Sequence, residues 1–239
     1  MLHRWRDRLS VAAIITVSLS AAAAATGLFS DDAGAAQPVQ QSQAGHGSGA
    51  PSAAPPMPPP ATIDGFRRAR FGMNEQQVRQ AIRQEFPDAS IGSTVHPSEK
   101  TTVLSITVAD LLPDTGNARV SYILGYRSKT LVQVNLLWIS ARSASADEAL
   151  VGAANSLRDY FMAQSNKGAN TIANRQVAEN AIIVFRTNDL QRRTILLVLS
   201  GTPAAAHPAK QGEPPLTLEL AYIEDPAHPD IFRIGKGQF

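Results

Sequence analysis

The chain of 239 residues contains no cysteine, and this absence excludes several chemistries at once. Without thiols there can be no disulfide, no thiolate nucleophile, no cysteine-based zinc site and no lipid-bearing cysteine of the bacterial lipoprotein type. The fold must therefore be stabilised by packing. A chain without thiols also suits an oxidising compartment, because nothing in it can mispair.

The sequence also lacks an excess of charge of one sign. Three of the 22 Lys and Arg residues and three of the 20 Asp and Glu residues precede Ile63, which leaves 19 basic and 17 acidic residues in the rest of the chain. This balance gives no general reason to expect nucleic acid as a partner. We therefore expect none.

Catalytic and cofactor motifs are missing as well. His96, His207 and His228 each precede a proline, and no two of them have the short spacing that is usual in a metal site. No Gly-x-Ser-x-Gly motif marks a nucleophile elbow, and no glycine-rich loop precedes a helix to hold a phosphate. We assign no catalytic residue, no metal ligand and no cofactor, and we expect a protein without enzymatic activity.

The first 36 residues have the pattern of an export signal. Arg4, Arg6 and Arg8 precede an uncharged, alanine-rich stretch from Leu9 to Phe29. Positive charge before such a stretch keeps the N-terminus in the cytoplasm and directs the following chain outward. Residues 1–36 are therefore predicted to be either a cleaved signal peptide or a retained inner-membrane anchor, since the stretch just reaches the roughly 20 residues of a spanning helix. Both alternatives predict a periplasmic protein, soluble or tethered to the inner membrane.

Residues 37–62 are predicted to be a disordered linker. Their composition is dominated by Gln, Gly, Ser, Ala and Pro, and the stretch from Pro55 to Pro60 contains five prolines. Such a segment cannot bury enough apolar surface to offset its loss of conformational entropy, and its proline-rich end favours an extended spacer. Residues 63–239 are then left as a single domain of ordinary size.

Two helices are predicted in this domain. Asn74 is a suitable N-cap for the first, and Gln77 occupies the third helical position of a capping box. The second is predicted to begin with Ser145 as its cap and Glu148 three residues later. The apolar residues at helical spacing are Val78, Ala81, Ile82 and Phe86 in the first helix, and Leu150, Ala154, Leu157 and Phe161 in the second.

Runs of alternating or β-branched residues predict strands after each helix. They are residues 90–95, 102–108, 118–126 and 130–139 after the first helix, and 181–186, 193–200 and 216–223 after the second. Trp138, Tyr122, Tyr126 and Tyr222 lie in these runs and are expected to be core or sheet-face aromatics. The fold class is therefore predicted to be α+β, with two helices packed on an antiparallel sheet and an order that suggests a helix-plus-strands unit repeated twice.

The start of the first helix resembles a known pattern. Residues 72–78 read Gly-Met-Asn-Glu-Gln-Gln-Val, which is similar to the Gly-Met-Thr/Ser-x-x-Gln/Glu-Val helix start of two protein types. These are the small lipoprotein of the outer-membrane β-barrel assembly machine and the β-lactamase inhibitor protein. Both are built from helices on an antiparallel sheet, so the resemblance implies this fold. The chain departs from them because it has neither a lipoprotein cysteine nor a disulfide pair.

A wider resemblance covers most of the domain. The segments 66–67, 71–73, 96–102, 111–116, 118–126 and 229–233 resemble a family of exported alphaproteobacterial proteins whose function is uncharacterised. The resemblance implies export and brings no activity with it.

The densest charge in the domain is the run Arg67-Arg68-Ala69-Arg70. One interpretation is a solvated rim that is partly paired with Asp64 and Glu85. The other is a binding site in which Arg67, Arg68 and Arg70 contact anionic lipid headgroups or an acidic partner.

These observations favour a non-enzymatic binding or scaffold protein of the cell envelope, whose partner is an envelope protein or an anionic membrane surface. Two alternatives stay open. An inhibitor of a secreted hydrolase would need an exposed aromatic or acidic patch on the sheet. A small periplasmic hydrolase or lipid carrier would need a deep pocket.

Overall fold

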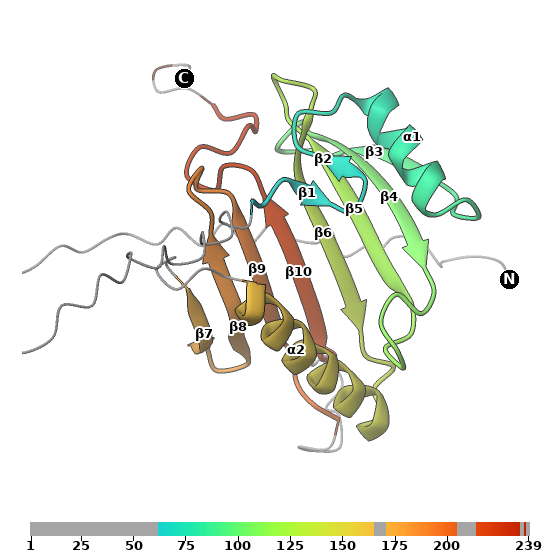
Figure 1. The fold of residues 1–239 in the computed structure, drawn as a ribbon, viewed down its shortest axis with the longest axis vertical. Helices are drawn as coiled ribbons and strands as arrows, with labels where there is room; N and C mark the ends of the chain where they lie inside the picture. The colour runs from blue at the N-terminus through green and yellow to red at the C-terminus, as the bar shows by residue number, and fades with distance from the viewer. Residues whose placement is uncertain (1–61, 165–170, 205–213, 235–236, 238–239) are drawn as a thin grey trace, which may run out of the picture. The chain divides into compact units, whose positions relative to one another are not determined.

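The computed structural model describes residues 62–164, 171–204, 214–234 and 237. Within them the fold is α+β, with two helices and one large antiparallel sheet of eight strands (Figure 1). The predicted fold class is confirmed. The predicted signal or anchor segment 1–36 and all but the last residue of the predicted linker lie outside the described residues.

The sheet consists of two four-stranded meanders that meet at its centre. The first contains β3 (Gly92–Val95), β4 (Thr102–Val108), β5 (Ala118–Leu124) and β6 (Leu131–Ile139). The second contains β7 (Ile172–Ala178), β8 (Ala181–Asn188), β9 (Thr194–Ser200) and β10 (Thr217–Ile223). The order across the sheet is β3-β4-β5-β6-β10-β9-β8-β7, so β6 and β10 form the central antiparallel pair, with Leu136 opposite Leu220.

Helix α1 (Glu75–Glu85) begins and packs as its sequence predicts. The side chain of Asn74 accepts a hydrogen bond from the backbone N–H of Gln77 at 3.0 Å, and the side chain of Gln77 accepts one from the N–H of Asn74 at 2.9 Å. This is the predicted capping box. Val78, Ala81 and Ile82 are buried in the core, and Phe86 is partly buried at the end of the helix.

Helix α2 (Ala144–Gln164) begins earlier than predicted. The hydroxyl of Ser143 accepts a hydrogen bond from the N–H of Ala146 at 3.2 Å, and its carbonyl accepts one from Asp147 at 3.0 Å. The cap is therefore Ser143, and the prediction of Ser145 was wrong because both serines can supply a capping oxygen. The predicted stripe is confirmed, since Leu150, Ala154 and Phe161 are buried and Leu157 packs against the core.

A short hairpin that the sequence did not predict lies beside the two helices, on the same side of the sheet. Strands β1 (Gly65–Phe66) and β2 (Ala69–Arg70) pair with each other, and Arg67 turns the chain with a left-handed φ of 53°. Gly65 is required there, because a Cβ atom on it would lie 2.1 Å from the carbonyl oxygen of Ala69. The hairpin contacts β6 and β10, and the ring of Phe66 lies 5.7 Å from that of Tyr222.

Both helices and the hairpin lie on one face of the sheet (Figure 1). The strand residues that point to this face form the main core, which includes Tyr122, Trp138, Leu136, Leu197 and Leu220. Because side chains alternate along a strand, the residues between them point to the opposite face. No helix of the described residues covers that opposite face, which we call the helix-free face.

Candidate binding surface

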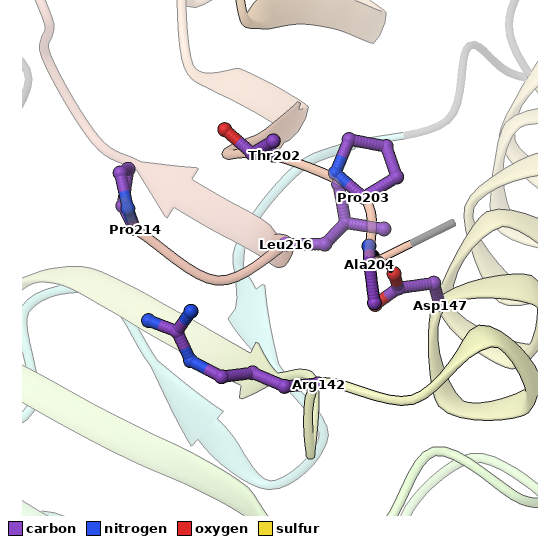
Figure 2. Close-up of a pocket in the computed structure, with 7 residues that line it drawn as sticks. All are labelled: Arg142, Asp147, Thr202, Pro203, Ala204, Pro214 and Leu216. Atoms are coloured by element: carbon purple, nitrogen blue, oxygen red, sulfur yellow. Dashed lines mark hydrogen bonds between the residues drawn. The ribbon is translucent and has the colours of Figure 1, made fainter. Parts of the chain in front are cut away.

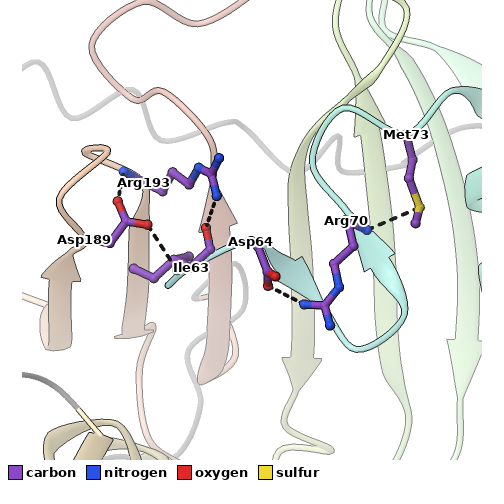
Figure 3. Close-up of polar contacts among 6 residues, drawn as sticks. All are labelled: Ile63, Asp64, Arg70, Met73, Asp189 and Arg193. Atoms are coloured by element: carbon purple, nitrogen blue, oxygen red, sulfur yellow. Dashed lines mark hydrogen bonds and ion pairs between the residues drawn. The ribbon is translucent and has the colours of Figure 1, made fainter. Parts of the chain in front are cut away.

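The three predicted binding arginines lie at the β1–β2 hairpin, and each has an acidic neighbour. Arg67 forms an ion pair with Glu85 at 2.6 Å, and Arg68 approaches the other oxygen of Glu85 at 3.4 Å. Arg70 pairs with Asp64 (Figure 3). The pairing with Asp64 and Glu85 that the sequence suggested is present. Whether the three arginines bind an anionic surface stays a prediction.

Arg67 also has a structural role in this hairpin. Its guanidinium group lies 5.6 Å from the centre of the Phe66 ring and 5.2 Å from that of Phe86. These contacts join the hairpin to the end of α1, where Glu85 holds the same guanidinium group. Arg68 is the most exposed of the three, with 63% of its side chain accessible. It is the arginine that an external anion could reach most easily.

Ile63, near the start of the described residues, is hydrogen-bonded to the half of the sheet that contains β7 to β10 (Figure 3). The N–H of Ile63 donates a hydrogen bond to Asp189 at 3.1 Å, and its carbonyl accepts one from the Arg193 side chain at 3.3 Å. Asp189 and Arg193 belong to the β8–β9 connection, so both halves of the sheet contact this segment. The chain therefore enters the folded part at a fixed place.

A small pocket lies beside the start of α2 (Figure 2). Asp147 is 5% exposed, and its carboxylate accepts hydrogen bonds from the hydroxyl of Ser140 and the N–H of Ala204. The pocket is about large enough for a water molecule. Asp147 thus joins the start of α2 to the segment after β9.

The described histidines have local partners. The Nδ1 atom of His96 accepts a hydrogen bond from the N–H of Glu99 at 3.2 Å, and His228 contacts Asp225 at 3.1 Å. Burial raises the pKa of Glu99, and His96 opposes this rise. His207 lies outside the described residues. Within the described part of the chain, no three His, Asp or Glu residues gather in a way that could hold a metal ion.

The helix-free face carries a second set of buried apolar side chains. Ile123, Ile183, Val198 and Ala221 are between 5% and 7% exposed, yet they do not belong to the main core. Around them lie partly exposed apolar and hydroxyl side chains of the same face. They are Val103, Ser105, Ser121, Leu137, Leu196, Ser200, Thr217 and Ile223. Gln133 and Asn135 of β6 lie on the same face. This face therefore mixes apolar, hydroxyl and amide side chains, and no layer of the described elements covers it.

Four charged residues lie on this face. Glu219 of β10 lies between Leu137 of β6 and Val198 of β9 in the pairing register. Arg119 lies opposite Leu137, Arg175 opposite Ile183, and Arg186 opposite Leu196. Burial raises the pKa of Glu219, so its ionised form is destabilised by lost hydration. Arg119, Arg186 and Glu219 lie in predicted strands, whereas Arg175 lies in β7, which the sequence did not predict. Only the order of the strands in the sheet shows that the four share one face.

On the helix-free face, the hydroxyl of Ser200 lies 3.0 Å from that of Thr217. Neither described helix is both long and apolar enough to cross a bilayer. Comparison with known proteins adds no assignment, because no family model, no curated protein and no solved structure matches the chain.

Proposed function

We propose that this protein is a non-enzymatic cell-envelope binding or scaffold protein, and that it binds another protein through the helix-free face. The observation that carries the proposal is the set of apolar side chains that stay partly exposed on this face, around the buried Ile123 and Val198, with no helix of the described residues over them. They are Val103, Leu137, Ile139, Leu196 and Ile223. Exposed apolar side chains that gather on one face are typical of interaction sites in soluble proteins.

The size of the face supports this role. Eight strands spaced about 4.8 Å apart span roughly 34 Å, and strands of seven residues are about 23 Å long. Their product is about 800 Å², which equals the area that one partner contributes to an interface of standard size. The face is therefore large enough for a protein interface of standard size.

The alternatives have less support. The strands contribute no aromatic side chain and one carboxylate, Glu219, to the helix-free face of the described sheet, whereas a hydrolase inhibitor was expected to need an aromatic or acidic patch. A hydrolase or lipid carrier was expected to need a deep pocket, and the space beside Asp147 is water-sized.

Site-specific photocrosslinking in intact cells tests the proposal. A crosslinking amino acid is placed at Thr107 or Ile139 on the helix-free face and, as a matched control, at Gln80 on the outer side of α1. All three positions are exposed. We expect one discrete crosslinked product from Thr107 and Ile139 and none from Gln80. Products that arise only from Gln80 would refute a docking role for this face.

A further inference from the structure

The four charged residues of the helix-free face, Arg119, Arg175, Arg186 and Glu219, are free of partners within the described structure. None of their side chains has a hydrogen bond or ion pair with another residue in the described ranges. In contrast, the exposed Arg70 of the hairpin and the partly exposed Arg158 of α2 have acidic or amide neighbours. The charges of the face are therefore available to a partner.

Glu219 is the central charge of this set, and the three arginines lie on either side of it. Glu219 lies on β10, one of the two central strands. Arg119 is two strands away on one side, so the two Cα atoms are about 10 Å apart, and Arg186 and Arg175 are about 12 and 14 Å away on the other side. Leu137 and Val198 separate Glu219 from the arginines. At these separations the charges interact only weakly through water.

A second copy of the chain does not complement this pattern. Face-to-face association would bring three arginines and one glutamate against an identical set, so cations would outnumber carboxylates on both sides of the interface. Like charges across an interface oppose association, whereas complementary charges favour it and set specificity. The best occupant therefore carries the opposite charges at matching places.

We infer that the helix-free face recognises a protein surface in which carboxylates surround one central cation. This inference rests on the proposed function and specifies the partner's chemistry. Arg119, Arg175 and Arg186 would meet the carboxylates, while Leu137 and Val198 would exclude water around Glu219 and the partner's cation. Glu219 has already lost part of its hydration on folding. Pairing it with a cation therefore removes less water than pairing a fully exposed carboxylate would.

The two kinds of charge contribute differently to binding. Charges at the rim of an interface mainly set the association rate and its dependence on salt. A charge pair at the dry centre mainly sets the dissociation rate, and truncating one member typically weakens binding by roughly 30-fold or more. Arg119 and Arg186 are thus specificity-determining through steering, and Glu219 through direct pairing.

Selection from a phage-displayed library of random peptides against the full chain tests the inference. We expect enriched peptides to contain several Asp or Glu residues, apolar residues and one Lys or Arg. Against Glu219→Gln, the preference for Lys or Arg should disappear while the preference for acidic residues stays. Against the double variant Arg119→Ser/Arg186→Ser, the acidic preference should disappear. Arg83→Ser, on the exposed side of α1, is the matched control and should select like the unmodified chain.

A binding titration with an enriched synthetic peptide gives a second measurement. Glu219→Gln should weaken binding by at least about tenfold, and Arg119→Ser/Arg186→Ser should reduce the loss of affinity between about 0.1 M and 1 M salt. Thermal melting of each variant shows whether it is folded.

The outcomes separate the inference from the proposed function. Peptides that are enriched without this charge pattern, but whose binding is abolished by Ser121→Trp on the helix-free face, would refute the inference alone. Enrichment that is unaffected by Ser121→Trp, or a complete lack of enrichment, would refute both.

Discussion

Leu136 and Leu137 are neighbours in β6, yet the structure predicts very different effects when each is replaced by alanine. Leu136 points into the core between Val120 and Leu220 and is 1% exposed. Leu137 points to the helix-free face and is partly exposed. The pair therefore tests the assignment of the two faces, because a register shift of one residue would exchange their environments.

The expected magnitudes follow from burial. Leu136→Ala leaves a cavity in a packed core and should lower the free energy of unfolding by about 2–5 kcal/mol. For a folded part of this size, each kcal/mol corresponds to about 2–4 °C, so the melting temperature should fall by roughly 5–15 °C. Leu137→Ala loses only part of a transfer free energy, and water can fill the space, so about 1 kcal/mol is expected.

Urea denaturation and thermal melting of the full chain, followed by circular dichroism, measure both variants. The urea midpoint should fall much further for Leu136→Ala, while the m-value stays unchanged. In contrast, Leu137→Ala should be the variant that weakens peptide binding to the helix-free face. Equal destabilisation by both, or a larger effect of Leu137→Ala, would show that the assignment of the faces is wrong.

Because burial raises the pKa of Glu219, the folded chain binds this proton more tightly than the unfolded chain, and stability is lost as pH rises above the ordinary value of 4.5. Glu219→Gln should therefore stabilise the chain at pH 7 but not at low pH in urea titrations, and equal effects at both would contradict the cause. Replacing Arg67, Arg68 and Arg70 by Ser should weaken binding to anionic vesicles at low salt, with a small loss of stability, since exposed ion pairs contribute about 0–1 kcal/mol each. Unchanged vesicle binding in a folded variant would remove the membrane role. The fragment 63–239 should melt in one transition by calorimetry, and two transitions would mean that the halves joined at β6 and β10 unfold separately.

Much of the fold could be predicted because its signals are local. The capping box of Asn74 and Gln77 and the alternation in β6 involve residues close in sequence, and both are present in the structure. Strand β7 was missed because Ile172–Ala178 lacks clear alternation and is exposed along an edge of the sheet. The hairpin of β1 and β2 was missed because Arg67, and not a glycine, adopts the left-handed conformation in its turn.

The candidate site depends on pairings that are distant in sequence. Arg67 and Arg70 form a charge cluster that is visible in the sequence, but in the structure their acidic neighbours pair with much of that charge. Glu219 lies in a short apolar strand, and a single carboxylate in such a strand does not by itself predict a binding site. Its significance appears only when β10 is placed between β6 and β9, because that register surrounds it with Leu137 and Val198.

The repeated architecture adds an argument for a role of Glu219 beyond folding. Leu136 and Leu220 face each other at the central seam, so Asn135 and Glu219, which precede them, occupy equivalent places in the two halves. Asn135 is 8% exposed, and its side-chain oxygen accepts a hydrogen bond from Gln133 at 2.7 Å. The fold therefore accommodates a neutral amide at this place. Glu219 instead presents a carboxylate whose ionised form is disfavoured by burial and that has no partner among the described residues. Because the equivalent place in the other half carries an amide, the fold does not depend on a carboxylate there. This argues that Glu219 serves the proposed pairing with a cation rather than folding.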